Sequence, residues 1–124
     1  GKMKINKTQE NLVELFLSRT ETEIACFCLH AARFCPYEAF EMYASTPEDG
    51  ERLEKLFRAA LNTSAQDGVS IVLSKRDLGT VSCAVGAMNV IGPEDSHPEL
   101  KDIAPDETVL DDFSEALHKG WTEV

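Results

Sequence analysis

The sequence lacks the features by which most enzymes and membrane proteins are identified. It contains no glycine-rich phosphate loop, no GxSxG segment and no HExxH segment, so none of the catalytic classes defined by these motifs is indicated. It also contains no apolar run of the ~20 residues that a membrane-spanning helix requires. The first residues, GKMKINKTQ, are polar, so we expect no signal peptide and a cytoplasmic protein.

Basic side chains are scarce in the last third of the chain. Residues 91–124 hold two basic and ten acidic residues, whereas residues 1–90 hold ten basic and twelve acidic ones. A negative surface repels phosphate backbones and anionic membranes, so direct binding to nucleic acid or lipid is disfavoured. The acidic segment is therefore interpreted either as a solvated face or as a contact surface for a basic protein partner or for cations.

The length of the chain is that of one ordinary domain. We expect a single domain over residues 1–124. A domain of this size buries about two-thirds of the surface that its unfolded chain exposes, so it needs neither a disulfide nor a structural metal for stability. Structural disulfides among the four cysteines are not expected in a chain without an export signal.

Two helices are predicted in the first 35 residues. The first covers Thr8–Ser18, where apolar residues recur at the spacing of an amphipathic helix. The second begins near Glu21, behind a capping box formed by Thr20 and Glu23, and runs to about Phe34. Its residues are apolar on nearly every side, which is typical of a helix buried at the centre of a domain.

A third helix has the clearest local signals. Thr46 can cap its N-terminus, and Pro47 suits the first turn. Apolar residues then form one stripe, and three acidic residues each precede a basic residue by four positions, which is the favoured orientation on a helix. The helix is expected to end near Asn62.

Two strands are predicted next. Residues 69–74 and 80–91 are rich in valine and isoleucine and flank a polar link that contains glycine, which indicates an antiparallel hairpin. The apolar alternation changes phase near Gly86, where we expect a β-bulge. Residues 92–107 follow as a long irregular segment with three prolines.

A last helix is predicted from about Asp106 to Lys119, with Gly120 as its C-cap and Trp121 packing back onto the domain.

Together, the elements predict an α+β fold. It would combine a helical N-terminal half with a central buried helix, an antiparallel β-hairpin that could extend to a small sheet, and a C-terminal acidic helix.

The segment CFCLHAARFC (26–35) gathers three cysteines and one histidine. On a helix, Cys26 and His30 lie on one side, whereas Cys28 and Cys35 lie nearly opposite. A tetrahedral zinc site needs four converging ligands, which one straight helix cannot supply. The apolar neighbours favour buried core thiols, with metal binding and redox chemistry as alternatives. Cys26 and His30 could act chemically only if the fold placed another ligand or an acidic side chain next to them.

Two further groups of residues are candidate sites. Cys83, expected on the second strand, could form a nucleophile pair with His97, but no motif supports this pair and a core or half-buried position is favoured. The loop EDSHPE (94–99) holds three acids and His97, which could bind a divalent ion. It lacks the glycine and the terminal acid of a calcium loop, so an exposed acidic loop is favoured.

The function that the sequence favours is non-catalytic. We expect a small acidic protein-binding module, of the inhibitor, chaperone or adaptor type, that contacts a basic partner through its acidic C-terminal segment. No catalytic residue, metal ligand or cofactor is assigned, and an enzyme is not favoured. The alternative is a small-molecule-binding or enzymatic domain with a pocket between the hairpin and the helices; a homo-oligomer also stays open. The partner-binding residues are Asp106, Glu107, Asp111, Asp112 and Glu115.

Overall fold

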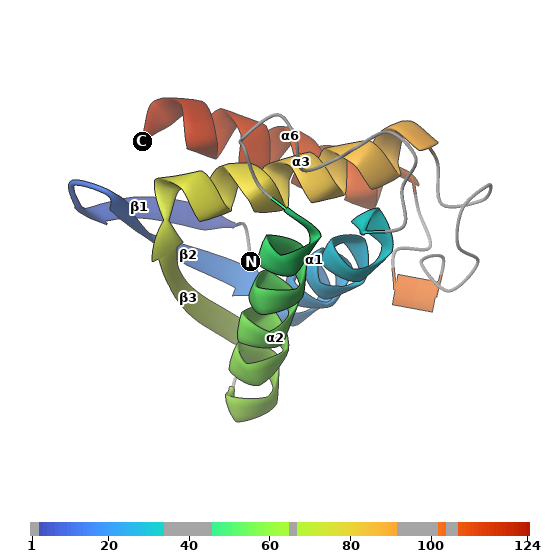
Figure 1. Ribbon diagram of the computed structural model, residues 1–124, viewed down its shortest axis with the longest axis horizontal. Coiled ribbons are helices and arrows are strands. Elements are labelled where there is room, and N and C mark those ends of the chain that lie inside the picture. Colours follow the sequence, from blue (N-terminus) through green and yellow to red (C-terminus); the bar gives the residue numbers. More distant parts are fainter. Residues whose placement is uncertain (1–2, 34–45, 65–66, 92–101, 104–106) are drawn as a thin grey trace.

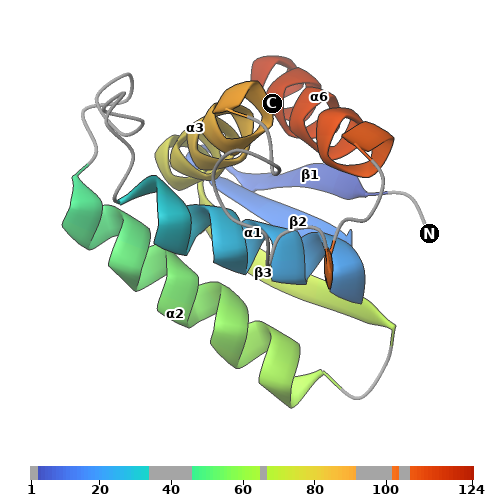
Figure 2. The same cartoon turned by 90° about the vertical axis from the view of Figure 1, so that its right-hand side faces the viewer.

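Seven helices and strands build the part of the chain that the computed structural model describes, which is residues 3–33, 46–64, 67–91, 102–103 and 107–124 (Figure 1). The three strands form an antiparallel sheet in the order β1-β2-β3, and the helices lie on one face of it (Figure 2). This is the α+β class with a small antiparallel sheet that the sequence predicts. The elements are β1 (Lys4–Gln9), β2 (Leu12–Ser18), α1 (Arg19–Ala32), α2 (Pro47–Thr63), β3 (Gly68–Ser74), α3 (Lys75–Ile91) and α6 (Glu107–Glu123).

The sheet has one buried and one exposed face. β2 pairs with β3 along its whole length, from Leu12 opposite Ser74 to Ser18 opposite Gly68. Alternate residues of a strand point to opposite faces, and the set that points to the helices is entirely buried. None of the described helices packs on the exposed face, which presents two large apolar side chains, Phe16 and Val72. The buried set is Val13, Leu15, Leu17, Val69, Ile71 and Leu73.

The helix predicted over Thr8–Ser18 is wrong, because this segment contributes to a β-hairpin. β1 and β2 are joined by a turn at Glu10 and Asn11, and Ile5 lies opposite Leu15. The apolar run of β2 fits a helical stripe, but Val13, Leu15 and Leu17 also lie on one face of a strand, and short runs of this kind cannot be assigned by periodicity alone. The backbone hydrogen bonds of β2 to a strand on each side determine the outcome.

Helix α1 is the central buried helix that the sequence predicts, but it begins earlier. Its capping box is formed by Ser18 and Glu21 rather than by Thr20 and Glu23. The Glu21 N–H donates to Ser18 Oγ at 3.0 Å, and the Ser18 N–H donates to the Glu21 carboxylate at 2.8 Å. Most of the helix interior is buried, including Cys26 and Cys28.

Helix α2 confirms the prediction made for it. Thr46 Oγ1 accepts the Asp49 N–H at 3.3 Å, and Pro47 occupies the first turn. The helix ends at Thr63, one residue beyond the predicted end. Leu53 and Phe57 are wholly buried, so one stripe of α2 enters the core between α1 and the sheet.

The first predicted strand after α2 is confirmed as β3, but the second is a helix. Residues 80–91 belong to α3, in which Ser74 caps the N-terminus by accepting the Asp77 N–H at 3.0 Å. The expected hairpin and bulge are therefore absent: Gly86 lies inside α3 and faces Ser114 of α6. Valine content favoured a strand, but the buried residues of α3 recur at helical spacing. These residues are Leu78, Val81, Val85 and Met88.

Helix α6 extends further than predicted. Gly120 is not its C-cap, because the helix continues to Glu123. A Cβ at Gly120 would collide with the side chain of Ile5, so the absence of a side chain lets β1 approach α6. Trp121 packs back as predicted: its Nε1–H donates to the Lys75 carbonyl at 3.2 Å, and Lys75 Nζ lies 5.3 Å from the ring centre.

The helices share one hydrophobic core with the sheet. None of the described helices has the length and apolarity needed to span a bilayer. The segment predicted to be irregular, 92–107, lies mostly outside the described residues. Its described parts are residues 102–103, which are helical, and residue 107, which begins α6.

Candidate functional site

Helix α6 carries three of the five acidic residues that the sequence predicts to bind a partner. Asp111, Asp112 and Glu115 are exposed, and one carboxylate oxygen from each lies within 4.8 Å of the others. They project outward because Leu110 and Phe113 occupy the opposite side of the helix and are buried in the core. Asp106 and the side chain of Glu107, which complete the predicted set, lie outside the described residues.

This acidic face has little local compensation. Asn89 of α3 donates to Asp111 Oδ1 at 3.1 Å, and none of the salt bridges in the described part of the chain involves the three carboxylates. Asp111 and Glu115 are one helical turn apart, so their charges repel by about 0.2–0.5 kcal/mol. Carboxylate oxygens are also ligands for a hard divalent cation, although exposure lets water compete for each of them. The arrangement is suited to contact with positive charge.

The packing of α2 against α1 brings an acidic side chain to the side of α1 that carries Cys26 and His30. Glu54 of α2 lies against His30, with 3.2 Å between Oε1 and Nδ1. Two arginines share the same carboxylate: Arg33 Nη2 lies 2.7 Å from Oε1, and Arg58 Nε lies 2.7 Å from Oε2. Burial raises the pKa of Glu54, but the hydrogen bonds from Arg58 and His30 outweigh it, so the pKa lies below its ordinary value. Glu54 is thus held as a carboxylate among three cationic or polar partners.

The thiol beside this cluster is not arranged as a nucleophile. Cys26 is 1% exposed, and burial raises its pKa to about 11, an effect that Arg58 only partly opposes. A nucleophilic cysteine needs the opposite, a lowered pKa and access to substrate. The Glu54 cluster is therefore best understood as a polar seam that joins α1 to α2.

The other thiols follow the favoured interpretation where they can be examined. Cys28 is wholly buried, and burial raises its pKa. Cys83 lies on α3 rather than on a strand and is half-buried, and burial raises its pKa as well. Cys35 and His97, like the rest of the EDSHPE loop, lie outside the described residues, so the pairing of Cys83 with His97 stays untested.

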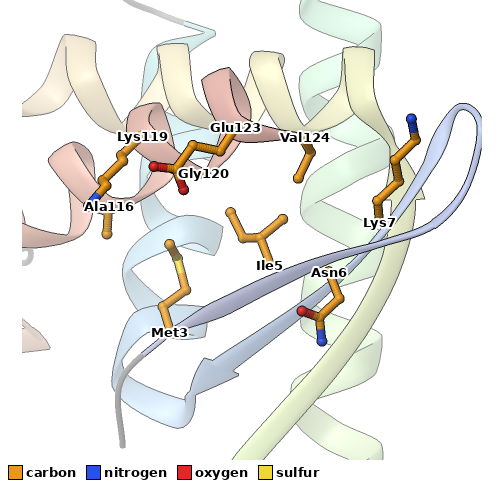
Figure 3. A pocket seen from close by; sticks show the side chains of 9 residues that line it. All are labelled: Met3, Ile5, Asn6, Lys7, Ala116, Lys119, Gly120, Glu123 and Val124. Atoms are coloured by element: carbon orange, nitrogen blue, oxygen red, sulfur yellow. The ribbon is translucent and has the colours of Figure 1, made fainter.

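A groove that the sequence did not reveal runs between β1 and α6 (Figure 3). Its volume is about 580 Å³. Figure 3 shows Met3, Ile5 and Lys7 pointing toward α6, while Asn6 points away. The α6 side is lined by Ala116, Lys119, Gly120, Glu123 and Val124.

This groove has the composition of a binding surface rather than of a catalytic centre. Most of its lining residues are apolar or glycine, and Lys7, Lys119 and Glu123 add charge. No cysteine, serine or histidine is among the described residues that line it. Sequence reasoning missed it because the strand that forms one wall, β1, was not predicted.

Comparison with known proteins adds no functional assignment. No protein-family model, no curated protein and no solved structure matches the chain.

Proposed function

We propose that this protein is a non-catalytic protein-binding module that contacts a basic surface of its partner through the acidic face of α6. The proposal rests on one observation, the exposed cluster of Asp111, Asp112 and Glu115 without a basic side chain bound to it among the described residues. Asp106 and Glu107 precede the cluster in the chain and would extend it. A cytoplasmic location remains part of this proposal.

The electrostatics of the cluster support such a role. A basic partner would replace the repulsion between neighbouring carboxylates with attraction. Complementary charge also raises the rate of association and disfavours partners of the wrong sign. Because exposed charges are screened by salt, binding through this face should weaken as the salt concentration rises. An inhibitor, a chaperone and an adaptor would all use the face in this way.

A charge-reversal experiment tests the proposal. The triple variant Asp111→Lys, Asp112→Lys, Glu115→Lys should lose its partner in a pull-down from the source organism while retaining the circular dichroism of the parent. A matched control reverses three exposed acids elsewhere, Glu10, Glu23 and Glu48, and so has the same net charge.

Only the first variant should lose binding. If both variants retain the partner, α6 is not the contact surface. If both lose it, net charge rather than α6 determines binding. Titration of isotope-labelled protein with an oligolysine peptide gives a second measurement, in which amide shifts should concentrate on α6.

The groove between β1 and α6 favours a second candidate, the binding of a small molecule or a short peptide. Its volume of about 580 Å³ falls within the range of ~300–1,000 Å³ that is usual for ligand sites. A fragment screen that monitors the methyl signals of Met3, Ile5 and Val124 tests it. A screen that yields no binder with shifts at these methyl groups would contradict this candidate.

A further inference from the structure

Strand β3 is an edge of the sheet without the features that usually protect an edge. It is the last strand in the order β1-β2-β3, and its seven residues, GVSIVLS, include no charge and no proline. Natural edge strands are commonly blunted by lysines, prolines or bulges. The opposite edge, β1, has two of these features: it carries Lys4 and Lys7, and its register with β2 shifts between Lys7 and Gln9. Of the two edge strands in the described sheet, only β3 therefore lacks these protective features.

The outward backbone groups of β3 can be assigned from the hydrogen bonds at its two ends. The Arg19 N–H donates to the Asp67 carbonyl at 3.1 Å, and the Lys75 N–H donates to the Asn11 carbonyl at 3.0 Å. Backbone groups alternate in direction along an antiparallel strand, so the odd-numbered residues of β3 bond to β2. Ser70 and Val72 consequently direct their N–H and C=O groups outward. The Gly68 carbonyl, which also points outward, accepts a hydrogen bond from the Ser64 hydroxyl.

We propose that β3 pairs in an antiparallel manner with β3 of a second copy of this chain, joining the two sheets into one sheet of six strands. With Ile71 on the twofold axis, Ser70 lies opposite Val72 of the other copy, and the reverse pair follows by symmetry. Each of these pairs can exchange two backbone hydrogen bonds. On the helical side, Val69 would meet Leu73 of the other copy, which extends the apolar core across the axis.

Charge at the two ends of the strand supports the antiparallel arrangement. Asp67 precedes β3 and is exposed, whereas Lys75 and Arg76 follow it. Antiparallel pairing about Ile71 places Asp67 beside these basic residues of the other copy, at both ends of the interface. Lys75 Nζ bonds to the Val124 carbonyl at 2.6 Å, whereas Arg76 Nη2 lies 3.8 Å from Asp49 Oδ2 and its side chain is 59% exposed. Arg76 is therefore held less tightly than Lys75 and has the greater reach. Parallel pairing would instead bring like charges together.

Helix α2 adds an apolar side chain on the same flank. Figure 2 shows α2 and β3 as the outermost helix and strand on one side of the molecule. At 100° per residue, Leu56 lies about 160° around α2 from Glu54, which faces α1. Leu56 is 39% exposed and thus lies on the side of α2 that faces away from α1. This flank combines an open strand edge, complementary charges and an exposed leucine.

Sedimentation analysis over a range of concentrations tests the pairing. The wild type should form a species of twice the 13.7 kDa of one chain. Val72→Lys places a charge at the paired edge and should raise the dimer dissociation constant at least tenfold. The control Phe16→Lys lies on the same exposed face but on the central strand, and it should leave the dissociation constant within about twofold of wild type. A wild type that stays monomeric up to millimolar concentration would overturn the proposal.

Two further measurements keep the proposal testable if a substitution impairs folding. In the wild-type dimer, amide exchange should be slow at Ser70 and Val72, and dilution to the monomer should accelerate it there while leaving Ile71 slow. Exchange that does not respond to dilution would contradict pairing at this edge. Asp67→Arg and Arg76→Asp should each weaken the dimer several-fold, and the double variant should recover affinity. A dimer insensitive to all of these changes would place the interface elsewhere.

Discussion

Glu54 offers the sharpest test of how α1 and α2 are held together. Its side chain is only 12% exposed and receives Arg33, Arg58 and His30 at 2.7, 2.7 and 3.2 Å. Replacing Glu54 with glutamine retains its size but removes the charge, and it turns one acceptor into an NH₂ group that faces a guanidinium. Arg33 then keeps only the exposed Glu51 as a counter-charge, at 3.8 Å, and Arg58 loses its acceptor at Glu54.

The size of the effect follows from burial. Hydrogen bonds to charged groups contribute about 1.5–3 kcal/mol when one partner is lost. We expect Glu54→Gln to lower the free energy of unfolding at pH 7 by about 2 kcal/mol on that basis. Glu51, three residues earlier on α2, is the matched control: it is 53% exposed and lies 3.4 and 3.8 Å from Lys55 and Arg33. Exposed pairs of this kind contribute only about 0.2–1 kcal/mol, so Glu51→Gln should be nearly neutral.

Urea unfolding of both variants at a series of pH values provides the measurement. The pKa of Glu54 is lower in the folded state than its ordinary value of 4.5, so the unfolded chain binds the proton more tightly. The stability that Glu54 contributes is then complete above about pH 4.5 and is lost as the pH falls through the folded-state pKa. The gap between wild type and Glu54→Gln should therefore close in acid. The reasoning is refuted by equal effects of the two variants at pH 7, or by a gap that is unchanged at pH 3.

Three other predictions test the core and the contacts of the sheet. The thiols of Cys26 and Cys28 should react with a maleimide only after denaturation, and rapid labelling of the native protein would contradict their burial. Ser18→Ala should lower the free energy of unfolding by about 1 kcal/mol through loss of the capping box, whereas Ser18→Asp should retain most of it in a thermal melt. Gly120→Val should separate α6 from β1 and lower the melting temperature in the wild type but have less effect with Ile5→Ala; equal effects in both backgrounds would show that the two residues are not coupled.

Local signals in the sequence were sufficient for some elements. α2 could be predicted because its cap, its first-turn proline and its apolar stripe all lie within one segment and agree with one another. The buried character of α1 could be predicted for a similar reason, since apolar residues surround Cys26 and Cys28 on nearly every side. β3 followed from its valine and isoleucine content and from the glycine that precedes it.

Other elements depended on partners that are distant in the chain. Residues 12–18 fit a helical stripe and can also form a strand, and pairing with β3, 50 or more residues later, makes them a strand. Residues 80–91 have valines that suit a strand, yet Leu78 and Met88 extend a stripe that only a helix places on α1 and α6. The preference of valine for strands contributes less free energy than the burial of this apolar stripe.

The candidate sites show the same division. The acidic face of α6 could be located because a run of charges and an opposing apolar stripe on one helix are visible in the sequence. The contact of Glu54 with His30 could not be predicted, since it joins two helices through packing rather than spacing. The groove could not be predicted because the sequence indicates no strand over Lys4–Gln9, which forms one of its walls.

The two proposed surfaces lie on opposite flanks of the molecule, which makes them compatible. α6 lies over β1, whereas β3 forms the other edge of the sheet (Figure 2). Pairing through β3 would leave both acidic faces exposed, one at each end of a six-stranded sheet. A partner with two basic sites could then bind both faces and gain avidity without any new contact. Val72→Lys should consequently weaken binding to an immobilised partner at high surface density but not at low density, although it lies far from α6. If the wild type and Val72→Lys bind equally well at both densities, the two acidic faces of a dimer do not bind together.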